Sequence, residues 1–397
     1  MAAIKVTDRI YSVGVLNPNM RIFDIIMETA YGTSYNAYLI KGSEKTALIE
    51  TTHHDYFDEL LDNLSAADAR QLDYIILNHT EPDHSGALAL LTEHCPDAEI
   101  VCSQAAGIYL KNIANKPLKM RIVKDGEQLS LGDHTLRFIN APFLHWPDSM
   151  FTFCPEQNVL FTCDFLGAHY CEPRMFSDRV TYPKAYEEAF RNYYDAIFSP
   201  FQEYVLKGLD KISDLSPKYI CTSHGPILTG DSIETARKCY RSWSLPAVHE
   251  DPVISIFYAS AYGCTKTLAE QIKDGISSAL PAAEVSLYNV NEHTTAALAV
   301  KMAESDAFLL GSPTLNKDAV APIWDLLART DSISARKKTA AAFGSFGWSG
   351  EAVPALTSRL KEMKFKVPSD GLKVCFVPSE EQKQEAYRFG RDFAAAL

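Results

Sequence analysis

One stretch of six residues in the first quarter of the chain carries four side chains that can bind a metal ion. Within its sequence His-Thr-Glu-Pro-Asp-His, the metal-binding types are His79, Glu81, Asp83 and His84. The stretch follows the apolar run 72–77, which is typical of a buried strand, and precedes the helix-like run 85–91. Two imidazoles and two carboxylates are therefore expected on one loop at the carboxyl end of a strand, where α/β folds place their sites.

Three later polar residues occupy similar positions in the sequence. His145 lies in the segment 141–147, Asp164 ends the apolar run 159–163, and His224 ends the run that begins at Tyr219. Each is predicted to close a strand-like segment and to precede a turn. A lone histidine of this kind is more often a hydrogen-bonded loop residue than a metal ligand. Repetition at the same end of several predicted strands favours a single metal-binding constellation.

The spacing of these seven residues resembles the ligand pattern of the metallo-β-lactamase superfamily, and specifically of its flavodiiron branch (A-type flavoproteins). The pattern is His-x-Glu-x-Asp-His, and intervals of 60, 18 and 59 residues then lead to the later histidine, aspartate and histidine. The hydrolase branch usually has histidine where this chain has Glu81. Mixed imidazole and carboxylate ligands suit iron and its oxygen chemistry. Ligand softness alone leaves zinc and manganese open, so the choice of iron comes from the resemblance.

The resemblance implies a diiron centre with an assigned role for each ligand. One iron is expected on His79, Glu81 and His145, the other on Asp83, His84 and His224, with Asp164 as the bridge. The assignment of His84 is the most open, because in some members of the family the corresponding histidine turns away from the metal.

Three further residues are candidates for the pocket beside the metals. The aromatic-rich, helix-like segment 184–214 contains Tyr193 and Tyr194, and the resemblance suggests that one of them faces the diiron centre. His169 could donate a hydrogen bond to bound oxygen. The alternatives are a core aromatic stripe for the tyrosines and an ordinary loop position for His169.

The composition describes a globular protein. At 397 residues the chain is long for a single core, so two domains are expected. The net charge of −12 argues against nucleic acid or an anionic membrane surface as a partner, although it allows a basic patch for a small acidic redox protein. We find no apolar run of about 18 residues that would span a membrane. The N-terminus does not read as a signal peptide, and a cytoplasmic location is expected.

The nine cysteines are scattered and form no Cys-x-x-Cys pair. This pattern excludes a fused rubredoxin-type iron centre and a simple zinc ribbon. We interpret the cysteines as free structural thiols in a reducing cytoplasm. Cys264 is the exception to this interpretation, because it lies in a loop that is a candidate for binding a ligand and is described below.

Residues 1–248 are predicted to form the first domain, a metallo-β-lactamase-like αββα sandwich with the metals at one edge between its two sheets. Short strands are expected at 10–14, 34–40 and 45–50, and a helix at 55–65. His53 and His54 read as a turn pair, although they could line a site. A proline-containing segment, 243–252, is the predicted linker.

Residues 253–397 are predicted to form the second domain, a flavodoxin-like, doubly wound, parallel five-stranded sheet. Strand 253–258 leads into a hydroxyl-rich loop and a helix that reaches about residue 280. Such a loop cradles phosphate, because backbone N–H groups and a helix N-terminus face the anion. The sequence lacks the P-loop and Rossmann glycine patterns. Strands at 284–290, 307–311, 339–343 and 373–377 then alternate with helices, and the expected order is 2-1-3-4-5.

Three loops of this domain are expected to bind FMN. The candidate residues are Ser260, Ala261, Tyr262, Gly263, Cys264 and Thr265 in the first loop, Ser312, Pro313, Thr314, Leu315 and Asn316 in the second, and Ser345, Phe346, Gly347, Trp348, Ser349 and Gly350 in the third. Trp348 is the natural residue to stack on the flavin ring, and the alternative is a surface tryptophan in a glycine-rich turn.

Both predicted domains belong to the α/β fold class. The combination of a metal domain with a flavin domain indicates a reductase whose metal site receives electrons from the flavin. The resemblance implies reduction of O₂ to water, of NO to N₂O, or of both, at two irons that FMN re-reduces. It also implies a head-to-tail homodimer or a dimer of dimers, and an external donor such as rubredoxin or a reduced deazaflavin. Two alternatives are a zinc hydrolase with a flavodoxin-like regulatory domain and a redox sensor with a vestigial metal site. Glu81 and the complete set of seven ligand positions argue against them.

Overall fold

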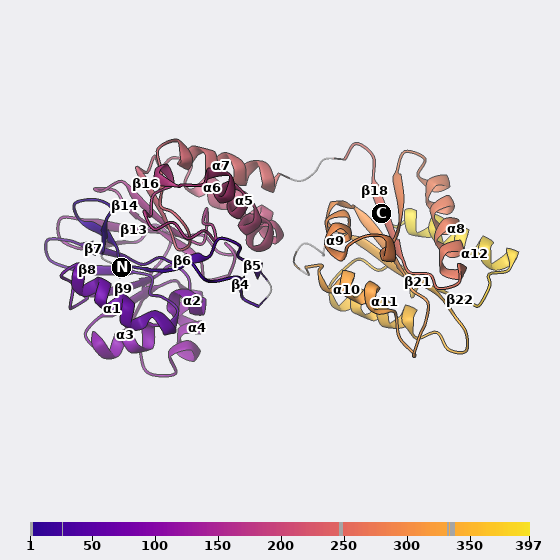
Figure 1. Cartoon of the computed structure of the whole chain (residues 1–397), viewed down its shortest axis with the longest axis horizontal. Helices are drawn as coiled ribbons and strands as arrows, with labels where there is room; N and C mark the ends of the chain where they lie inside the picture. The colour runs from indigo at the N-terminus through magenta and orange to yellow at the C-terminus, as the bar shows by residue number, and fades with distance from the viewer. Residues whose placement is uncertain (1–2, 26, 246–248, 332, 334–337) are drawn as a thin grey trace. The chain divides into compact units, whose positions relative to one another are not determined.

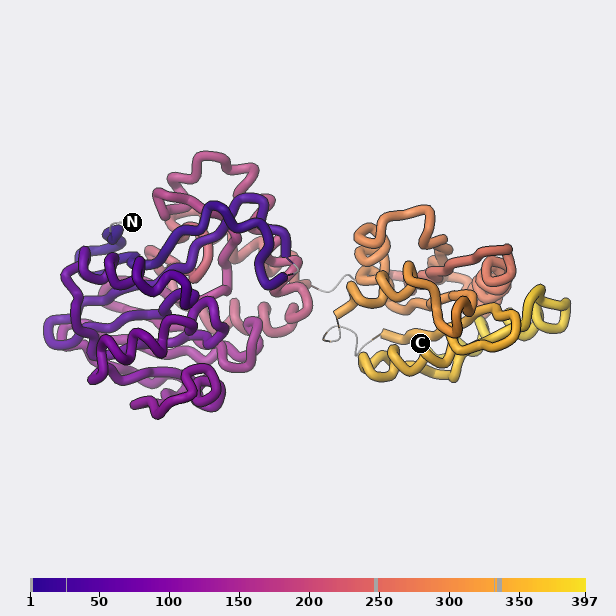
Figure 2. The backbone as a smooth tube through the Cα atoms, turned by 60° about the horizontal axis from the view of Figure 1, so that its bottom comes forward, coloured from indigo at the N-terminus to yellow at the C-terminus, as the bar shows by residue number. Residues whose placement is uncertain are grey.

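The computed structural model describes residues 3–25, 27–245, 249–331, 333 and 338–397. It divides the chain into two compact units, Met1–Leu245 and Pro246–Leu397, which Figures 1 and 2 trace from the N-terminus to the C-terminus. Of the predicted linker, residues 246–248 lie outside the described residues.

Two large sheets form the centre of the first unit. The first has the order β1-β2-β7-β8-β9-β10-β11 and the second β12-β13-β14-β15-β16-β17. The strands of the first sheet are β1 (Ile4–Lys5), β2 (Ile10–Ser12), β7 (Tyr38–Lys41), β8 (Thr46–Ile49), β9 (Tyr74–Leu77), β10 (Glu99–Cys102) and β11 (Met120–Ile122). Those of the second are β12 (Gln128–Ser130), β13 (Thr135–Asn140), β14 (Met150–Cys154), β15 (Val159–Cys163), β16 (Tyr219–Thr222) and β17 (Leu228–Thr229). Two small ribbons pair β3 (Val15–Asn17) with β6 (Thr33–Tyr35) and β4 (Ile22–Phe23) with β5 (Met27–Glu28).

Helices cover the outer face of each sheet, as Figure 1 shows. The first sheet carries α1 (Phe57–Ala66), α3 (Leu88–His94) and α4 (Gln104–Ala114), and the second carries α5 (Pro183–Tyr193), α6 (Gln202–Lys211) and α7 (Asp231–Ser244). Three buried clusters separate the four layers. One joins Leu60 of α1 to Leu48, one joins Ile49 to Phe161 between the sheets, and one joins Leu160 to Tyr240 of α7. This is the predicted αββα sandwich.

Two predicted elements of this unit are interrupted in the structure. The predicted strand 34–40 splits into β6 and β7, because the Asn36 side-chain amide donates to the carbonyls of Thr222 and Gly225 and draws the chain away from the ribbon. The helical segment 184–214 is broken after α5 by a π-turn (Tyr194–Phe198) and a 3₁₀ turn (Ser199–Phe201). Pro200 lacks a backbone N–H and cannot continue a regular helix.

The second unit is a three-layer α/β/α sandwich. Its strands are β18 (Val253–Tyr258), β19 (Glu284–Asn289), β20 (Ala307–Gly311), β21 (Thr339–Phe346) and β22 (Leu372–Cys375). All pair in parallel in the order β19-β18-β20-β21-β22, which is the predicted 2-1-3-4-5 arrangement. Helices α8 (Cys264–Ala279) and α12 (Glu380–Ala394) pack on one face, and α9 (Thr295–Glu304), α10 (Ala321–Ala328) and α11 (Ala352–Glu362) on the other.

Some boundaries of this unit differ from the prediction. Strand β21 continues to Phe346, so Ser345 and Phe346 lie at a strand end rather than in the loop. Cys264 is the first residue of α8 rather than a loop residue. Both shifts are small, because the ends of elements are set by hydrogen bonds that periodicity does not reveal.

Replacement of Gly275 in α8 or of Gly390 in α12 by a larger residue should disrupt the packing of these two helices against each other. A Cβ atom on Gly390 would lie 2.2 Å from the carbonyl oxygen of Ile272, and one on Gly275 would lie 2.0 Å from that of Tyr387. The nearest atoms are backbone oxygens, which cannot move aside as the end of a flexible side chain can. Gly390→Ala is therefore expected to destabilise the second unit by about 1–3 kcal/mol, a typical cost of overpacking. Calorimetric unfolding would measure the loss, and Gln384→Ala, on the exposed face of the same helix, is the matched control. An unchanged transition for Gly390→Ala would contradict this interpretation.

Candidate functional site

The His79 segment changes from strand to helix within a few residues. Strand β9 ends at Leu77, Glu81 is the N-cap residue, and Pro82 opens the short helix α2 (Pro82–Ser85). Proline suits the first helical position, because its φ is already helical and its missing N–H is not needed there. Asp83 and His84 thus lie on a helical turn and not on the predicted loop.

The later three residues come from the second sheet. Asp164 directly follows β15, and His224 lies two residues beyond β16. The prediction that His145 closes a strand is wrong, because β13 ends at Asn140 and His145 lies in the connection to β14. That connection is a tight turn in which the Phe143 N–H donates to the carbonyl of Trp146.

Asp164 lies between two pairs of histidines. Its Oδ2 atom is 3.2 Å from Nε2 of His145 and 3.7 Å from Nε2 of His79. Its Oδ1 atom is 3.1 Å from Nε2 of His84 and 3.4 Å from Nε2 of His224. Each oxygen of one carboxylate therefore faces a separate pair of imidazoles, which is the arrangement of a bridging ligand.

A second carboxylate completes each pair. Oε2 of Glu81 lies 3.1 Å from Nε2 of His79 and 3.2 Å from Nε2 of His145. Oδ2 of Asp83 lies 3.0 Å from Nε2 of His224, and its Oδ1 lies 3.3 Å from Nε2 of His84. The structure therefore brings all seven predicted ligands together, in two groups of two imidazoles and one carboxylate that share Asp164.

The chemistry of these groups fits two metal ions. Nε2 of His84, both carboxylate oxygens of Asp83 and Oδ1 of Asp164 are buried, and no described residue gives them a hydrogen bond. Burial of so many polar atoms that make no hydrogen bond is costly. An ion at their centre would satisfy them, because ligand atoms about 2.0–2.2 Å from one ion lie roughly 3 Å from one another.

The buried carboxylates also determine the protonation of His84. Burial disfavours a charged His84 ring, but Asp83 and Asp164 outweigh it and raise the pKa of His84 to about 10. The imidazole is therefore protonated near neutral pH until a cation replaces the proton, so metal binding releases protons.

The structure separates the two candidate tyrosines. The ring centroid of Tyr193 lies 4.8 Å from that of His169 and 6.1 Å from that of His224, so this tyrosine borders the metal groups. The Tyr194 hydroxyl lies 2.8 Å from Oγ of Ser244 in α7, where it takes no part in the cluster. The candidacy of Tyr194 is thus contradicted, because the two side chains leave successive positions of the helix in different directions.

His169 lies where the prediction placed it, beside the metal groups. Its Nδ1 atom is 2.8 Å from Oγ1 of Thr33, and its Nε2 atom is buried without a hydrogen bond from any described residue. Burial and the neighbouring His224 hold the pKa of His169 well below its usual range, so the ring is neutral.

Several residues at the site have no signal in the sequence pattern. Phe23 of β4 packs against His169 with a centroid distance of 4.3 Å. Burial and the Glu81 carboxylate raise the pKa of Asp24 to about 6. Burial raises the pKa of Glu50, whose carboxylate accepts from the backbone of Asn78, to about 8. Asp148, which is fully buried, lies against His79. The sequence could have drawn attention to Asp148 alone, as a charged residue directly after the segment 141–147 that contains His145.

The candidate flavin loops gather at the carboxyl edge of the parallel sheet. Gly263 precedes α8 with a φ of +84°, a conformation that favours glycine, and turns the chain into the helix. Oγ1 of Thr265 lies 2.8 Å from Oγ of Ser345, which joins the first loop to the third. The second loop is joined to the third by the Thr314 N–H, which donates to the carbonyl of Ser345. The remaining residues of the three loops lie at the same edge, and the Trp348 side chain is 83% exposed there.

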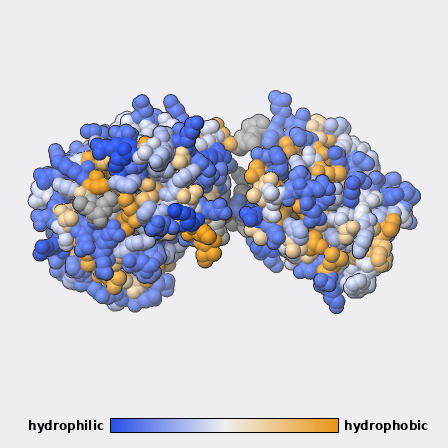
Figure 3. All heavy atoms as spheres, viewed as in Figure 1, coloured by the Kyte–Doolittle hydropathy of each residue, from blue (hydrophilic) through white to orange (hydrophobic). Residues whose placement is uncertain are grey.

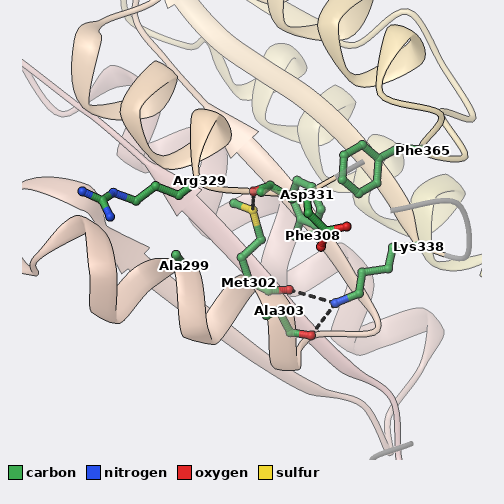
Figure 4. A pocket seen from close by; sticks show the side chains of 9 residues that line it. Ala299, Met302, Ala303, Phe308, Arg329, Asp331, Lys338 and Phe365 are labelled. Carbon is green, nitrogen blue, oxygen red and sulfur yellow. Dashed lines mark hydrogen bonds between the residues drawn. The ribbon is translucent and has the colours of Figure 1, made fainter. Parts of the chain in front are cut away.

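A separate cavity in the second unit does not belong to this site. It has a volume of about 50 Å³ and lies at the amino ends of β20 and β21, where Lys338 donates to the carbonyls of Met302 and Ala303 (Figure 4). Phe308 and Phe365 form part of its wall. A space of this size holds about one or two water molecules and is too small for a flavin. Lys338 thus caps the end of α9.

The other predicted features behave as structural elements. His54 begins a 3₁₀ turn (His54–Tyr56), and Nδ1 of His53 accepts from the Asp55 N–H, in keeping with a turn pair. All nine cysteines are free, and Cys375 is the exposed one. Within the described residues, none of the helices is both long enough and apolar enough to cross a membrane. Hydrophilic side chains cover most of the face that Figure 3 shows.

Comparison with known proteins gives the family. Residues 33–225 match the family described as ODP family beta lactamase, and residues 256–390 match the Flavodoxin family. The chain is 52% identical to the Flavo-diiron protein FprA2 of Clostridium acetobutylicum, and the alignment covers 100% of both chains. The chain belongs to the flavodiiron protein family. Its cofactors are accordingly a non-haem diiron centre and FMN, and it is an oxidoreductase.

Other flavodiiron relatives match over nearly the whole chain. The Nitric oxide reductase of Moorella thermoacetica is 36% identical over 99% of this chain and 98% of its own length. The solved structure of rubredoxin oxygen:oxidoreductase from Desulfovibrio gigas is 30% identical, with a TM-score of 0.72 over 99% of this chain and 98% of that chain. The similarity to these relatives thus extends over both units of the chain.

Proposed function

We propose that this flavodiiron protein reduces O₂, NO or both, at a diiron centre that FMN re-reduces. The observation that carries the proposal is the position of Asp164, whose two oxygens face two separate groups of two histidines and one carboxylate. A flavodoxin-like unit in the same chain supplies the means of delivering electrons. The names of the Moorella and Desulfovibrio relatives refer to NO and to oxygen respectively, which supports both substrates.

The residues of each group have defined roles in this proposal. His79, Glu81 and His145 would hold one iron, Asp83, His84 and His224 the other, and Asp164 would bridge them. When bound, the two irons supply electrons and open coordination positions for a small diatomic substrate. His224 is oriented by its Nδ1–H, which donates to the Ser34 carbonyl at 2.6 Å and leaves Nε2 free to bind metal.

His169 and Tyr193 would act on the substrate from the other side of the pocket. The Thr33 hydroxyl is placed to donate to Nδ1 of His169, which would put the ring proton on Nε2, the atom that has no partner among the described residues. His169 would then donate this hydrogen to a substrate oxygen. Burial and the Asp164 charge raise the pKa of Tyr193 well above its usual range, so its hydroxyl stays protonated. Phe23 and Tyr193 both pack against the His169 ring and hold it in place.

The flavin would lie in the three loops of the second unit. The N-terminus of α8 would receive the FMN phosphate, and Trp348 would stack on the ring. Electrons would come from an external donor such as rubredoxin, a protein that the name of the Desulfovibrio relative contains.

We also propose a cytoplasmic location and a head-to-tail homodimer, or a dimer of dimers, that brings the flavin of one copy beside the irons of another. A strictly monomeric and fully active enzyme in sedimentation experiments would contradict the dimer.

A zinc hydrolase with a flavodoxin-like regulatory unit is the alternative. Each metal group contains a carboxylate besides Asp164, and this hard oxygen content favours iron over an imidazole-rich zinc site. The membership of the family and the match to Flavodoxin both argue for redox chemistry.

An anaerobic mixing experiment tests the proposed function. The purified protein is assayed for iron and flavin, reduced, and mixed separately with O₂ and with NO. About two irons and one FMN per chain, with rapid reoxidation by at least one gas, are expected, and the faster gas identifies the preferred substrate. Bound zinc in place of iron, or a reduced protein inert to both gases, would refute the proposal.

Removal of the Trp348 ring should weaken FMN binding without affecting the irons. An aromatic pair contributes roughly 0.5–1.5 kcal/mol beyond its buried area, so Trp348→Ala is expected to raise the Kd for FMN by about 2–10-fold. Fluorescence titration of the flavin-free protein with FMN would measure the change. Trp324→Ala on α10 is the control for loss of a tryptophan, and equal Kd values in the wild type and Trp348→Ala would argue against stacking.

A further inference from the structure

Asp148 lies behind His79, on the side of the ring that faces away from the metal groups. We propose that this carboxylate makes the two metal positions electronically unequal. Acting through His79, it stabilises the oxidised ion at the position formed by His79, Glu81 and His145, so that this ion has the lower reduction potential. Asp148 is a positioning residue, and the inference rests on the diiron function proposed above.

The contacts of Asp148 direct its charge at one ligand. Its Oδ1 atom accepts from Nδ1–H of His79 at 3.2 Å, and its Oδ2 atom accepts from the Thr80 N–H at 2.8 Å and the Thr80 hydroxyl at 2.7 Å. The Asp148 side chain is fully buried. Within the described residues, no lysine or arginine lies within 4.0 Å of it. The negative charge is therefore shared between His79 and two neutral donors of Thr80, and no cationic side chain of the described residues pairs with it apart from the His79 ring.

In the other metal group, the Nδ1–H of His224 has a neutral hydrogen-bond acceptor instead of a carboxylate. Nδ1–H of His224 donates to the Ser34 backbone carbonyl, a neutral acceptor, at 2.6 Å. Among the four ligand histidines of the described chain, His79 alone has a carboxylate within 4.0 Å of Nδ1. The atoms that face the ions are otherwise matched, since each group has two imidazoles, one carboxylate and one oxygen of Asp164. The asymmetry between the groups thus arises one layer outside the ligands.

The direction of the effect follows from the charge. A carboxylate accepts the Nδ1 hydrogen more strongly than a carbonyl does, which increases the electron density at Nε2 and the basicity of the ring. A more basic ligand favours the ion of higher charge. Each couple consists of Fe(III) and one electron giving Fe(II), with the electron supplied by a mediator, and no bond to Asp148 forms or breaks.

Potentiometric titration of the iron- and FMN-loaded protein tests the inference. The wild type is expected to show two separate one-electron iron couples, followed through the spectroscopic signal of the mixed-valent state. In Asp148→Asn the lower couple is expected to shift upward and the upper couple to stay in place. A competing chelator should remove one iron at about 10–100-fold lower concentration, because changing the partner of a ligand histidine weakens metal binding by that factor.

Two further variants keep the test decisive. Thr80→Val removes one donor from the Asp148 carboxylate and so leaves more charge for His79, which should move the lower couple downward, opposite to Asp148→Asn. Ser103→Ala removes a hydrogen bond to the Asp148 backbone carbonyl without touching the carboxylate, and both couples should stay in place. Unchanged couples in both Asp148→Asn and Thr80→Val, or equal shifts of both couples, would overturn the inference. A wild type without two iron couples would refute the diiron function itself, which is a different result.

Discussion

Replacement of Asp164 by alanine is expected to give a protein that keeps its FMN and loses both irons. The two oxygens of this carboxylate face different histidine pairs, so a single substitution removes a ligand from each metal position and also the negative charge between them. Loss of a residue that only supports a ligand costs about 10–100-fold in metal affinity, and loss of a shared ligand should cost more at both positions. Reduction of O₂ and NO should fall to background.

Iron and flavin assays on the same preparation would measure this result. Asp8→Asn changes an exposed carboxylate of the same unit and should retain two irons. Near-normal FMN content in Asp164→Ala would show that the second unit is intact. Retention of one tightly bound iron by Asp164→Ala would show that the two groups are independent and would contradict the bridge.

The complementary substitution, Ser260→Glu, should give a protein with two irons and no FMN. Ser260 lies in the loop before α8, and its Oγ accepts from the Lys266 N–H within the first turn of that helix. A carboxylate at this position would compete with the FMN phosphate. Two unit charges about 4 Å apart near a protein surface repel by about 4 kcal/mol, which corresponds to roughly a 1,000-fold weaker affinity.

Ser260→Ala separates charge from the loss of a hydroxyl. It removes one hydrogen bond without adding charge, so its FMN affinity should change far less than that of Ser260→Glu. Turnover with a protein donor should be lost in Ser260→Glu, while chemically reduced irons should still be oxidised by the gas once. Wild-type FMN affinity in Ser260→Glu would exclude a phosphate site in this loop.

Six of the seven candidate metal ligands could be predicted from the pattern because they follow strands whose apolar runs are strong. Asp164 and His224 illustrate this, since the runs before them form adjacent parallel strands, β15 and β16. The flavodoxin-like order was predictable for the same reason: strands and helices alternate regularly, and parallel strands place their following loops at one edge. His145 lies in the connection between β13 and β14 and fits only the spacing of the family pattern.

The sequence pattern could not show which of Tyr193 and Tyr194 borders the metal groups. The two residues are neighbours, and the directions of their side chains depend on a π-turn that begins at Tyr194. Residues that support the ligands were also missed. Asp148 contacts a histidine 69 positions away, and Phe23 contacts one much farther along the chain. Such contacts result from the packing of two sheets, and periodicity within one segment contains no information about them.

The origin of the ligands in two different sheets has a consequence for folding. His79, Glu81, Asp83 and His84 follow a strand of the first sheet, whereas His145, Asp164 and His224 belong to connections of the second. Every iron would therefore be held from both sheets and would act as a cross-link over the apolar layer between them. The unfolded chain cannot offer this arrangement, so the free energy of metal binding adds to the stability of the first unit. Iron supply would thus control how much of this unit is folded, in addition to how much of it is active.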